Sequence, residues 1–129
     1  MDTTLKEFVI PEDVSHLEIA SVNYDQWILT IAVRLYSKSD QTVIGMTHAI
    51  FEKADGFRVL NKDNMIRFPW SEFSNSSSFV HEVDNGGWLE MEKKSGNIVG
   101  LEDAKEYLVY GSNEAISVIA YTEPKYVAG

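Results

Sequence analysis

The three histidines are the side chains best suited to metal binding or acid–base chemistry, and they lie far apart in the sequence. They are His16, His48 and His81. No two of them have the close spacing, such as HxH or HxxxH, with which one element presents two ligands to a metal. Each falls on a separate predicted strand, and a lone histidine on an apolar strand face is more often a hydrogen-bonded core residue than a ligand. The sequence therefore predicts no metal and no other cofactor.

Nucleophilic catalysis has no recognisable arrangement of residues either. The chain contains no cysteine, and no serine lies in a GxSxG motif. Five of the twelve serines cluster in one polar segment, residues 71–78, without an adjacent histidine. The glycines form neither a GxGxxG nor a GxxxxGK phosphate loop. We expect no hydrolase activity.

Paired carboxylates are frequent, as chance alone predicts for a chain this acidic. A carboxyl group that transfers protons near neutral pH needs to be desolvated, often beside an aromatic ring. Glu90 follows Trp88 by two residues and is the candidate for that role. The simpler interpretation is a solvated face, because glutamate is almost never fully buried unless it is paired. The sequence thus favours a protein that is not an enzyme.

Trp70 and Trp88 are the aromatic residues that stand out, because each lies at the edge of a predicted loop rather than in the middle of a strand. Tryptophan at such a position is a common anchor in protein interfaces. The alternative is a ring that closes one edge of the core. Both interpretations stay open at this point.

Residues 79–94 are predicted to form a hairpin closed through Asp84-Asn85-Gly86-Gly87. A two-residue Asn85-Gly86 turn would mix polar and apolar cross-strand partners, whereas a longer loop over residues 84–88 separates them, so burial favours the longer loop. One apolar face then contains Phe79, Val83, Leu89 and Met91. The other face contains the acids Glu82, Glu90 and Glu92, with Asp84 at the tip. Direct opposition of Glu82 and Glu90 would cost a few tenths of a kcal/mol. We predict a partner-binding site from this acidic face and the two tryptophans, consisting of Glu82, Asp84, Trp88, Glu90, Glu92 and Trp70.

The charge of the chain restricts its partners. Twenty acidic residues against 11 basic ones give a formal net charge of −9. Nucleic acid and anionic membranes both attract basic surfaces, so neither is expected to bind. A cationic protein partner is compatible with this charge, while solubility alone is the alternative explanation.

The stretch from Trp27 to Lys38 is the longest clean alternation in the chain and predicts a central strand. Its apolar face would contain Trp27, Leu29, Ile31, Val33 and Leu35, and its other face is mixed. Asn23-Tyr24-Asp25 is predicted to turn the chain into this strand, and residues 37–41 to turn it out.

Shorter strands are predicted around it, separated by turns such as Asp55-Gly56. They cover residues 17–22, 42–52, 57–60 and 65–68, with a last hairpin of residues 106–110 and 115–121 around Gly111-Ser112-Asn113. Small residues alternate along residues 43–51 and indicate close packing on that face. Helical turns are predicted near Ser71 and over residues 101–105, and residues 123–129 are predicted to be a loose tail.

Together these elements predict one domain over residues 1–129, mainly β, built as an antiparallel sandwich or half-open barrel of about eight to ten short strands with one or two helical turns. No apolar run approaches the roughly 18–20 residues of a membrane span, and the N-terminal residues do not resemble a signal peptide. With the absence of cysteine, this predicts a cytoplasmic protein.

The function that these observations favour is that of a non-catalytic, acidic protein that binds another protein. An inhibitor or immunity-type protein that masks a cationic toxin or enzyme suits the size and the charge, by analogy of class. One alternative is a β-barrel that binds or converts a small molecule in an aromatic pocket. Another is a structural subunit that assembles through an edge strand. The sequence does not specify the oligomeric state.

Overall fold

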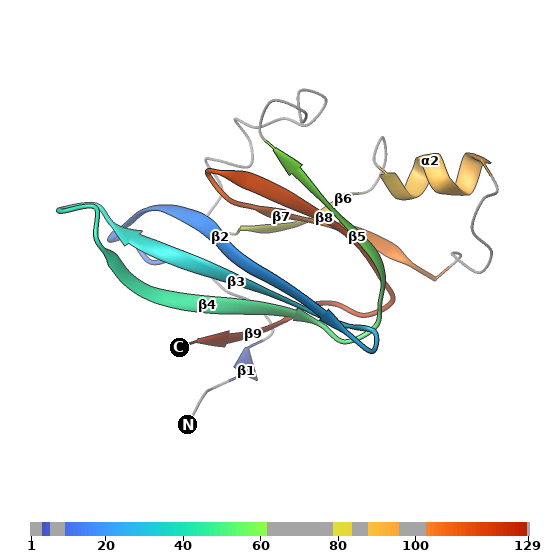
Figure 1. Ribbon diagram of the computed structural model, residues 1–129, viewed down its shortest axis with the longest axis horizontal. Coiled ribbons are helices and arrows are strands. Elements are labelled where there is room, and N and C mark those ends of the chain that lie inside the picture. Colours follow the sequence, from blue (N-terminus) through green and yellow to red (C-terminus); the bar gives the residue numbers. More distant parts are fainter. Residues whose placement is uncertain (1–3, 6–9, 62–78, 84–87, 96–102, 129) are drawn as a thin grey trace.

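Two antiparallel sheets pack against each other in the computed structural model, which describes residues 4–5, 10–61, 79–83, 88–95 and 103–128 (Figure 1). The first sheet contains, in spatial order, β1 (Thr4–Leu5), β9 (Lys125–Ala128), β4 (Val43–Phe51), β3 (Ile28–Ser37) and β2 (Val14–Asp25). The second contains β5 (Ala54–Asn61), β8 (Glu114–Ala120), β7 (Lys105–Tyr110) and β6 (Val80–Val83). The predicted sandwich is thereby confirmed, and the described strands do not close into a barrel.

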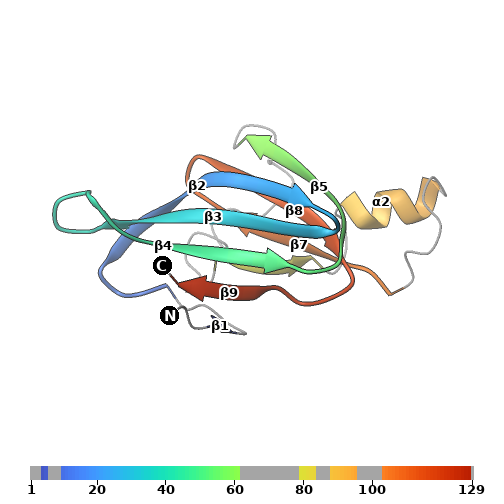
Figure 2. The same ribbon diagram turned by 60° about the horizontal axis from the view of Figure 1, so that its bottom comes forward.

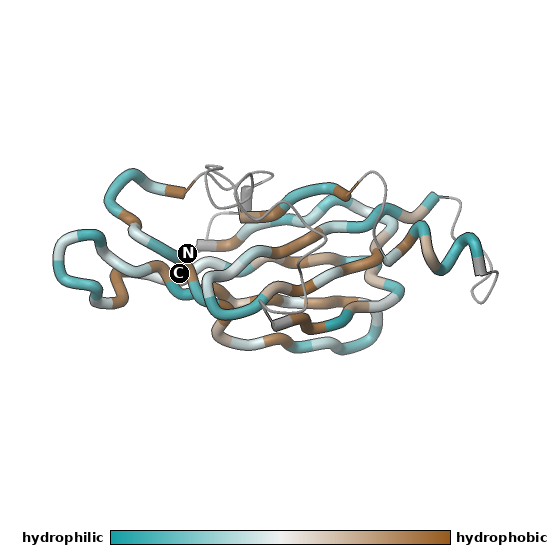
Figure 3. The backbone as a smooth tube through the Cα atoms, turned by 90° about the horizontal axis from the view of Figure 1, so that it is seen from above, coloured by the Kyte–Doolittle hydropathy of each residue, from teal (hydrophilic) through white to brown (hydrophobic). Residues whose placement is uncertain are grey.

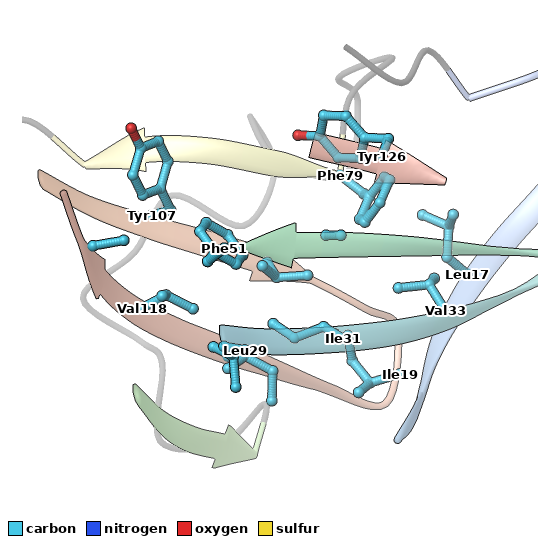
Figure 4. Packing of buried hydrophobic residues seen from close by; sticks show 14 of the residues in the cluster. Leu17, Ile19, Leu29, Ile31, Val33, Phe51, Phe79, Tyr107, Val118 and Tyr126 are labelled. Carbon is cyan, nitrogen blue, oxygen red and sulfur yellow. The ribbon is translucent and has the colours of Figure 1, made fainter. Parts of the chain in front are cut away.

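The predicted central strand is confirmed as β3, which pairs with β2 on one side and β4 on the other. Leu29, Ile31 and Val33 have no exposed surface, and Leu35 is 8% exposed. Figure 4 shows Leu29, Ile31 and Val33 of β3 in the buried cluster that also contains Val118 of β8. The alternation arises because successive side chains of a strand point to opposite faces, so that every second residue enters the core.

The strands beside β3 follow the predicted patterns, including their irregularities. In β4, Thr47, Ala49 and Phe51 are fully buried, which confirms close packing on the face of small residues. In β2 the pairing shifts between Ile19 and Ser21, a bulge that explains why the alternation in residues 17–22 is imperfect. Figure 3 shows hydrophobic and hydrophilic positions alternating along the strands.

Aromatic pairs lie at both open sides of the sandwich, where the sheet edges meet. Tyr24 of β2 contacts Phe57 of β5, with ring centroids 5.6 Å apart. On the opposite side Phe79 contacts Tyr126 of β9 at 5.7 Å, edge to face. Such tilted arrangements are the favoured geometry of aromatic pairs. The loose tail predicted for residues 123–129 is wrong where the structure describes it. Residues 125–128 form β9, which pairs with β4, and Tyr126 is buried.

The predicted hairpin over residues 79–94 is wrong in its second half. β6 pairs with β7, and residues 88–95 form a helix, α2 (Trp88–Ser95). This run contains no β-branched residue, and its glutamates, lysines, leucine and methionine all favour a helix. Glu90 in the first turn and Lys94 in the last complement the helix dipole and form an ion pair at 3.1 Å.

Two predicted turns are also corrected. Asp55 and Gly56 lie within β5, and the chain turns earlier, at residues 52–53. A side-chain Cβ at Gly56 would be 3.3 Å from Cη2 of Trp88, so the glycine gives room to the indole rather than forming a turn. The helical turn predicted over residues 101–105 does not include Lys105, which begins β7. The predicted elements within residues 62–78 lie outside the described residues.

The last predicted hairpin is confirmed, and its turn covers the edge of β2. The carboxamide of Asn113 accepts a hydrogen bond from the Ile19 N–H at 3.0 Å and donates one to the Ile19 carbonyl at 3.2 Å. A Cβ at Gly111 would lie 2.9 Å from Cγ1 of Ile19, so only glycine allows this approach. Asn113 thus takes the place of a neighbouring strand at Ile19 and protects part of the edge.

The hydroxyl group of Tyr107 makes the stability of this fold sensitive to alkaline pH. Burial raises its pKa to about 12, and the nearby carboxylates of Glu82 and Glu123 contribute to the rise. Above its unfolded pKa of about 10 the unfolded chain loses this proton while the folded chain keeps it, so the free energy of unfolding should fall between about pH 10 and pH 12. Urea denaturation across that range should show a shallower fall for Tyr107→Phe. Equal slopes for the two proteins would contradict the prediction.

Candidate functional site

The structure does not bring the predicted acidic site together on one hairpin. Glu82 lies on β6 opposite Tyr107, and its carboxylate is 3.7 Å from Nζ of Lys105. Glu90 lies on α2 and pairs with Lys94. Trp70 and Asp84 lie outside the described residues. The expected opposition of Glu82 and Glu90 across a hairpin is therefore wrong, and a lysine lies beside each of these two carboxylates.

Trp88 is half-buried and holds α2 against the second sheet. Its indole lies over Gly56 of β5, and the guanidinium carbon of Arg58 is 5.2 Å from its ring centroid. The indole Nε1 donates a hydrogen bond to Glu92 at 3.1 Å. These contacts match the interpretation of Trp88 as a ring that closes one edge of the core. Glu92 takes part in the same contacts between α2 and the second sheet. Its role as a partner anchor stays a prediction.

A buried carboxylate, which the sequence did not single out, lies beneath the start of α2. Glu106 of β7 is 1% exposed, and its Oε1 accepts a hydrogen bond from the Leu89 N–H at 2.9 Å. Its Oε2 accepts one from the hydroxyl of Ser117 on β8, which is fully buried. A negative charge is favourable at a helix N-terminus, where amide groups have no partner within the helix. The arrangement therefore attaches α2 to the sheet.

This buried group does not form a catalytic relay with the described histidines. His81 is separated from Ser117 by Leu108 in the strand register, about 10 Å across two strand spacings. His16 stacks on Tyr36 in the first sheet, with ring centroids 4.5 Å apart, and His48 lies on β4. Within the part of the chain that the structure describes, no three or more His, Asp or Glu residues are grouped so as to hold a metal ion.

The most exposed large apolar side chain among the described residues belongs to Trp27, which is 58% exposed. It lies in the turn between β2 and β3, and Tyr24 and Ile28 beside it are 43% and 44% exposed. We refer to residues 24–28 as the hairpin tip. The prediction that Trp27 faces the core is thus wrong, because β3 begins at Ile28 and Asp25 is the last residue of β2.

The backbone of the hairpin tip is strained. Gln26 has a φ of 48° and Trp27 a φ of 74°. Left-handed φ values at both central residues define the type I′ turn, for which Asn-Gly is the favoured sequence. For residues with a side chain this region costs roughly 1–2 kcal/mol each. Such strain is concentrated at functional sites, so the tip is a candidate site on geometric grounds.

Hydrogen bonds fix the hairpin tip to the rest of the sandwich. The carbonyl of Trp27 accepts a hydrogen bond from the Ala54 N–H at 2.8 Å, and the Tyr24 hydroxyl donates one to the Ala54 carbonyl at 3.1 Å. Figures 1 and 2 show the β2–β3 connection beside the β4–β5 connection, at the end of the sandwich that also carries α2. The tip therefore presents an exposed indole on a firmly held backbone.

Comparisons with protein-family models, with curated proteins and with solved structures find no match to this chain. In the described ranges, no helix has the length and apolar character needed to cross a membrane.

Proposed function

We propose that the protein is a non-catalytic domain that binds a cationic protein. The observation that carries this proposal is Trp27, a large aromatic side chain exposed on a fixed hairpin tip. Tryptophan is enriched among the residues that dominate binding energy in protein interfaces, because it gives a large contact area at a small cost in conformational entropy.

The charge of the chain supports a basic partner. With a net charge of −9, the protein attracts cationic surfaces and repels nucleic acid and anionic lipid. Asp25 is exposed directly beside the turn, and Glu52 and Lys125 form an ion pair at the same end of the sandwich. Complementary charge mainly speeds association and selects among partners, while the aromatic anchor supplies affinity.

The narrower form of the proposal is an inhibitor or immunity-type protein that masks a cationic toxin or enzyme in the cytoplasm. It is supported by the small size and the charge of the chain. A small-molecule barrel receives less support, because it requires closure, which the two described sheets lack. A structural subunit that assembles through an edge strand remains the other alternative, although at the edge of β2 it would have to displace Asn113 from Ile19.

Association kinetics with the partner test the charge dependence. We expect Asp25→Lys, at the hairpin tip, to slow association by about threefold or more at low ionic strength, with an effect that declines as salt screens the charges. The matched control is Glu12→Lys, which makes the same change in net charge two residues before β2, at the opposite end of a strand that spans about 36 Å. The rate should be measured by stopped flow across a salt series. If Glu12→Lys slows association as much as Asp25→Lys, the contact does not lie at the tip. If neither change alters the rate, the acids are merely solvated and the partner is not selected by charge.

A further inference from the structure

The turn at the hairpin tip contains two residues that suit it poorly. Asp25 pairs with Ile28 across a two-residue turn, and both residues between them adopt left-handed φ values. Glycine and asparagine adopt such values most readily, whereas a bulky residue at positive φ is an outlier. The chain nevertheless has Gln26 and Trp27 at these positions.

The contacts of the turn do not explain why residue 27 is a tryptophan. The hydrogen bond from the Ala54 N–H goes to the backbone carbonyl of Trp27, and a glycine would accept the same bond with less strain. More than half of the side chain is exposed, so the core contributes little to keeping the indole in place. Folding alone would favour Asn-Gly at residues 26–27.

We propose that the hairpin tip is the contact element of the protein, and that it inserts Trp27 into an apolar pocket with a basic rim on a partner protein. This inference rests on the proposed function and specifies its site and its mode. Tyr24 and Ile28 flank the indole and extend the apolar contact, while Asp25 meets the rim. Because one hydrogen bond to Ala54 holds the Trp27 carbonyl and another holds the Tyr24 hydroxyl, little backbone entropy is lost on binding.

Charge distinguishes the partner protein from the other surfaces that an exposed tryptophan can enter. An anionic membrane would be repelled by a net charge of −9, and so would a second copy of the same chain. A basic partner instead gains from the same charge. Membrane binding and self-association are therefore outcomes that would overturn the inference.

The decisive variant is the double substitution Gln26→Asn with Trp27→Gly, which gives the turn its favoured sequence. We expect it to unfold at a higher urea concentration than the wild type, because the strain is relieved, and to bind the partner at least 30-fold more weakly, because the anchor is lost. Opposite changes in stability and affinity are not the result of a damaged fold. They are the result expected if Trp27 contributes to binding and lowers the stability of the fold.

Two control variants separate the anchor from the strain and from general loss of apolar surface. Gln26→Gly relieves strain at one position but keeps Trp27, so its affinity should stay within threefold of the wild type. Val43→Ala truncates an apolar side chain that is 50% exposed at the opposite end of β3 and β4, and it should also bind within threefold. Both proteins should remain folded by circular dichroism.

The partner is obtained by placing a photo-crosslinking amino acid at position 26, which keeps Trp27, in the source cell and identifying the attached protein by mass spectrometry. That protein is then purified, and its dissociation constant for each variant is measured by isothermal titration calorimetry. Vesicles of phosphatidylcholine, alone or with one quarter phosphatidylserine, test membrane binding. Sedimentation velocity tests self-association.

The inference holds if the identified partner is basic and binds the Asn-Gly variant at least 30-fold more weakly, with both controls near the wild type. It is overturned if the Asn-Gly variant binds within threefold, if that variant is less stable, or if Trp27 mediates binding to vesicles or to a second copy. Loss of affinity in Asp25→Lys without any dependence on Trp27 would leave a charge-selected partner standing and reject the insertion of Trp27. A wild-type protein that binds no protein partner would reject both.

Discussion

Replacing Ile31 by alanine is expected to lower the free energy of unfolding by about 2–5 kcal/mol. Ile31 has no exposed surface and lies on β3, which is paired on both sides, so its truncation leaves a cavity that the neighbouring strands cannot easily fill. Urea denaturation monitored by circular dichroism measures the effect.

Ile28→Ala provides a matched control, because it is the same substitution on the same strand. Ile28 is 44% exposed at the end of β3, and its truncation should cost less than about 1 kcal/mol. A cost below 1 kcal/mol for Ile31→Ala, or equal costs for the two variants, would show that β3 is not at the centre of the core.

The sequence predicted β3 well because burial and strand geometry act together there. Leu29, Ile31 and Val33 alternate over a length that no helix pattern matches, and the sheet buries all three. The β7–β8 hairpin was predicted equally well from the sequence, since Gly111 to Asn113 form a clear turn signal between two apolar runs. In both cases the local pattern and the tertiary environment favour the same structure.

Residues 88–95 were mispredicted because a short amphipathic run fits two periods. Leu89 and Met91 alternate with Glu90 and Glu92, as in a strand, although all four residues also favour a helix. A contact distant in sequence favours the helix, since the carboxylate of Glu106 accepts a hydrogen bond from the Leu89 N–H. Tertiary contacts of this kind are not visible in local patterns.

The candidate site was missed for a related reason. The alternation from Trp27 to Leu35 places the indole on the buried face, and only the position of the turn removes it from there. Neither Gln26 nor Trp27 signals a left-handed turn, because such turns are recognised in sequences by glycine and asparagine. The turn predicted at Asn23-Tyr24-Asp25 is wrong, because these residues belong to β2 and the chain turns at Gln26 and Trp27. The acidic character of the protein, in contrast, follows from composition alone.

Glu106→Ala is expected to lower the free energy of unfolding by about 2–6 kcal/mol, because it removes the acceptor of two buried donors. The Leu89 N–H and the Ser117 hydroxyl would each be left without that partner, at about 1–3 kcal/mol apiece. The loss should be largest at α2, where amide hydrogen exchange should speed up from the first turn and the fluorescence of Trp88 should shift toward that of an exposed indole.

Glu106→Gln is the matched control, since it keeps the shape and removes the charge. Its carbonyl oxygen can still accept from Leu89, and its amide group can donate to Ser117, whose hydroxyl oxygen is able to accept. We expect a cost of about 1–2 kcal/mol for this variant, from the loss of charge-assisted hydrogen bonds and of the favourable charge at the helix N-terminus. If alanine and glutamine at position 106 destabilise the protein equally, the charge rather than the hydrogen bonds holds α2 on the sheet. If neither destabilises it, the helix is held by Trp88 and Leu89 alone, and the buried carboxylate is not what fixes the helix beside the hairpin tip.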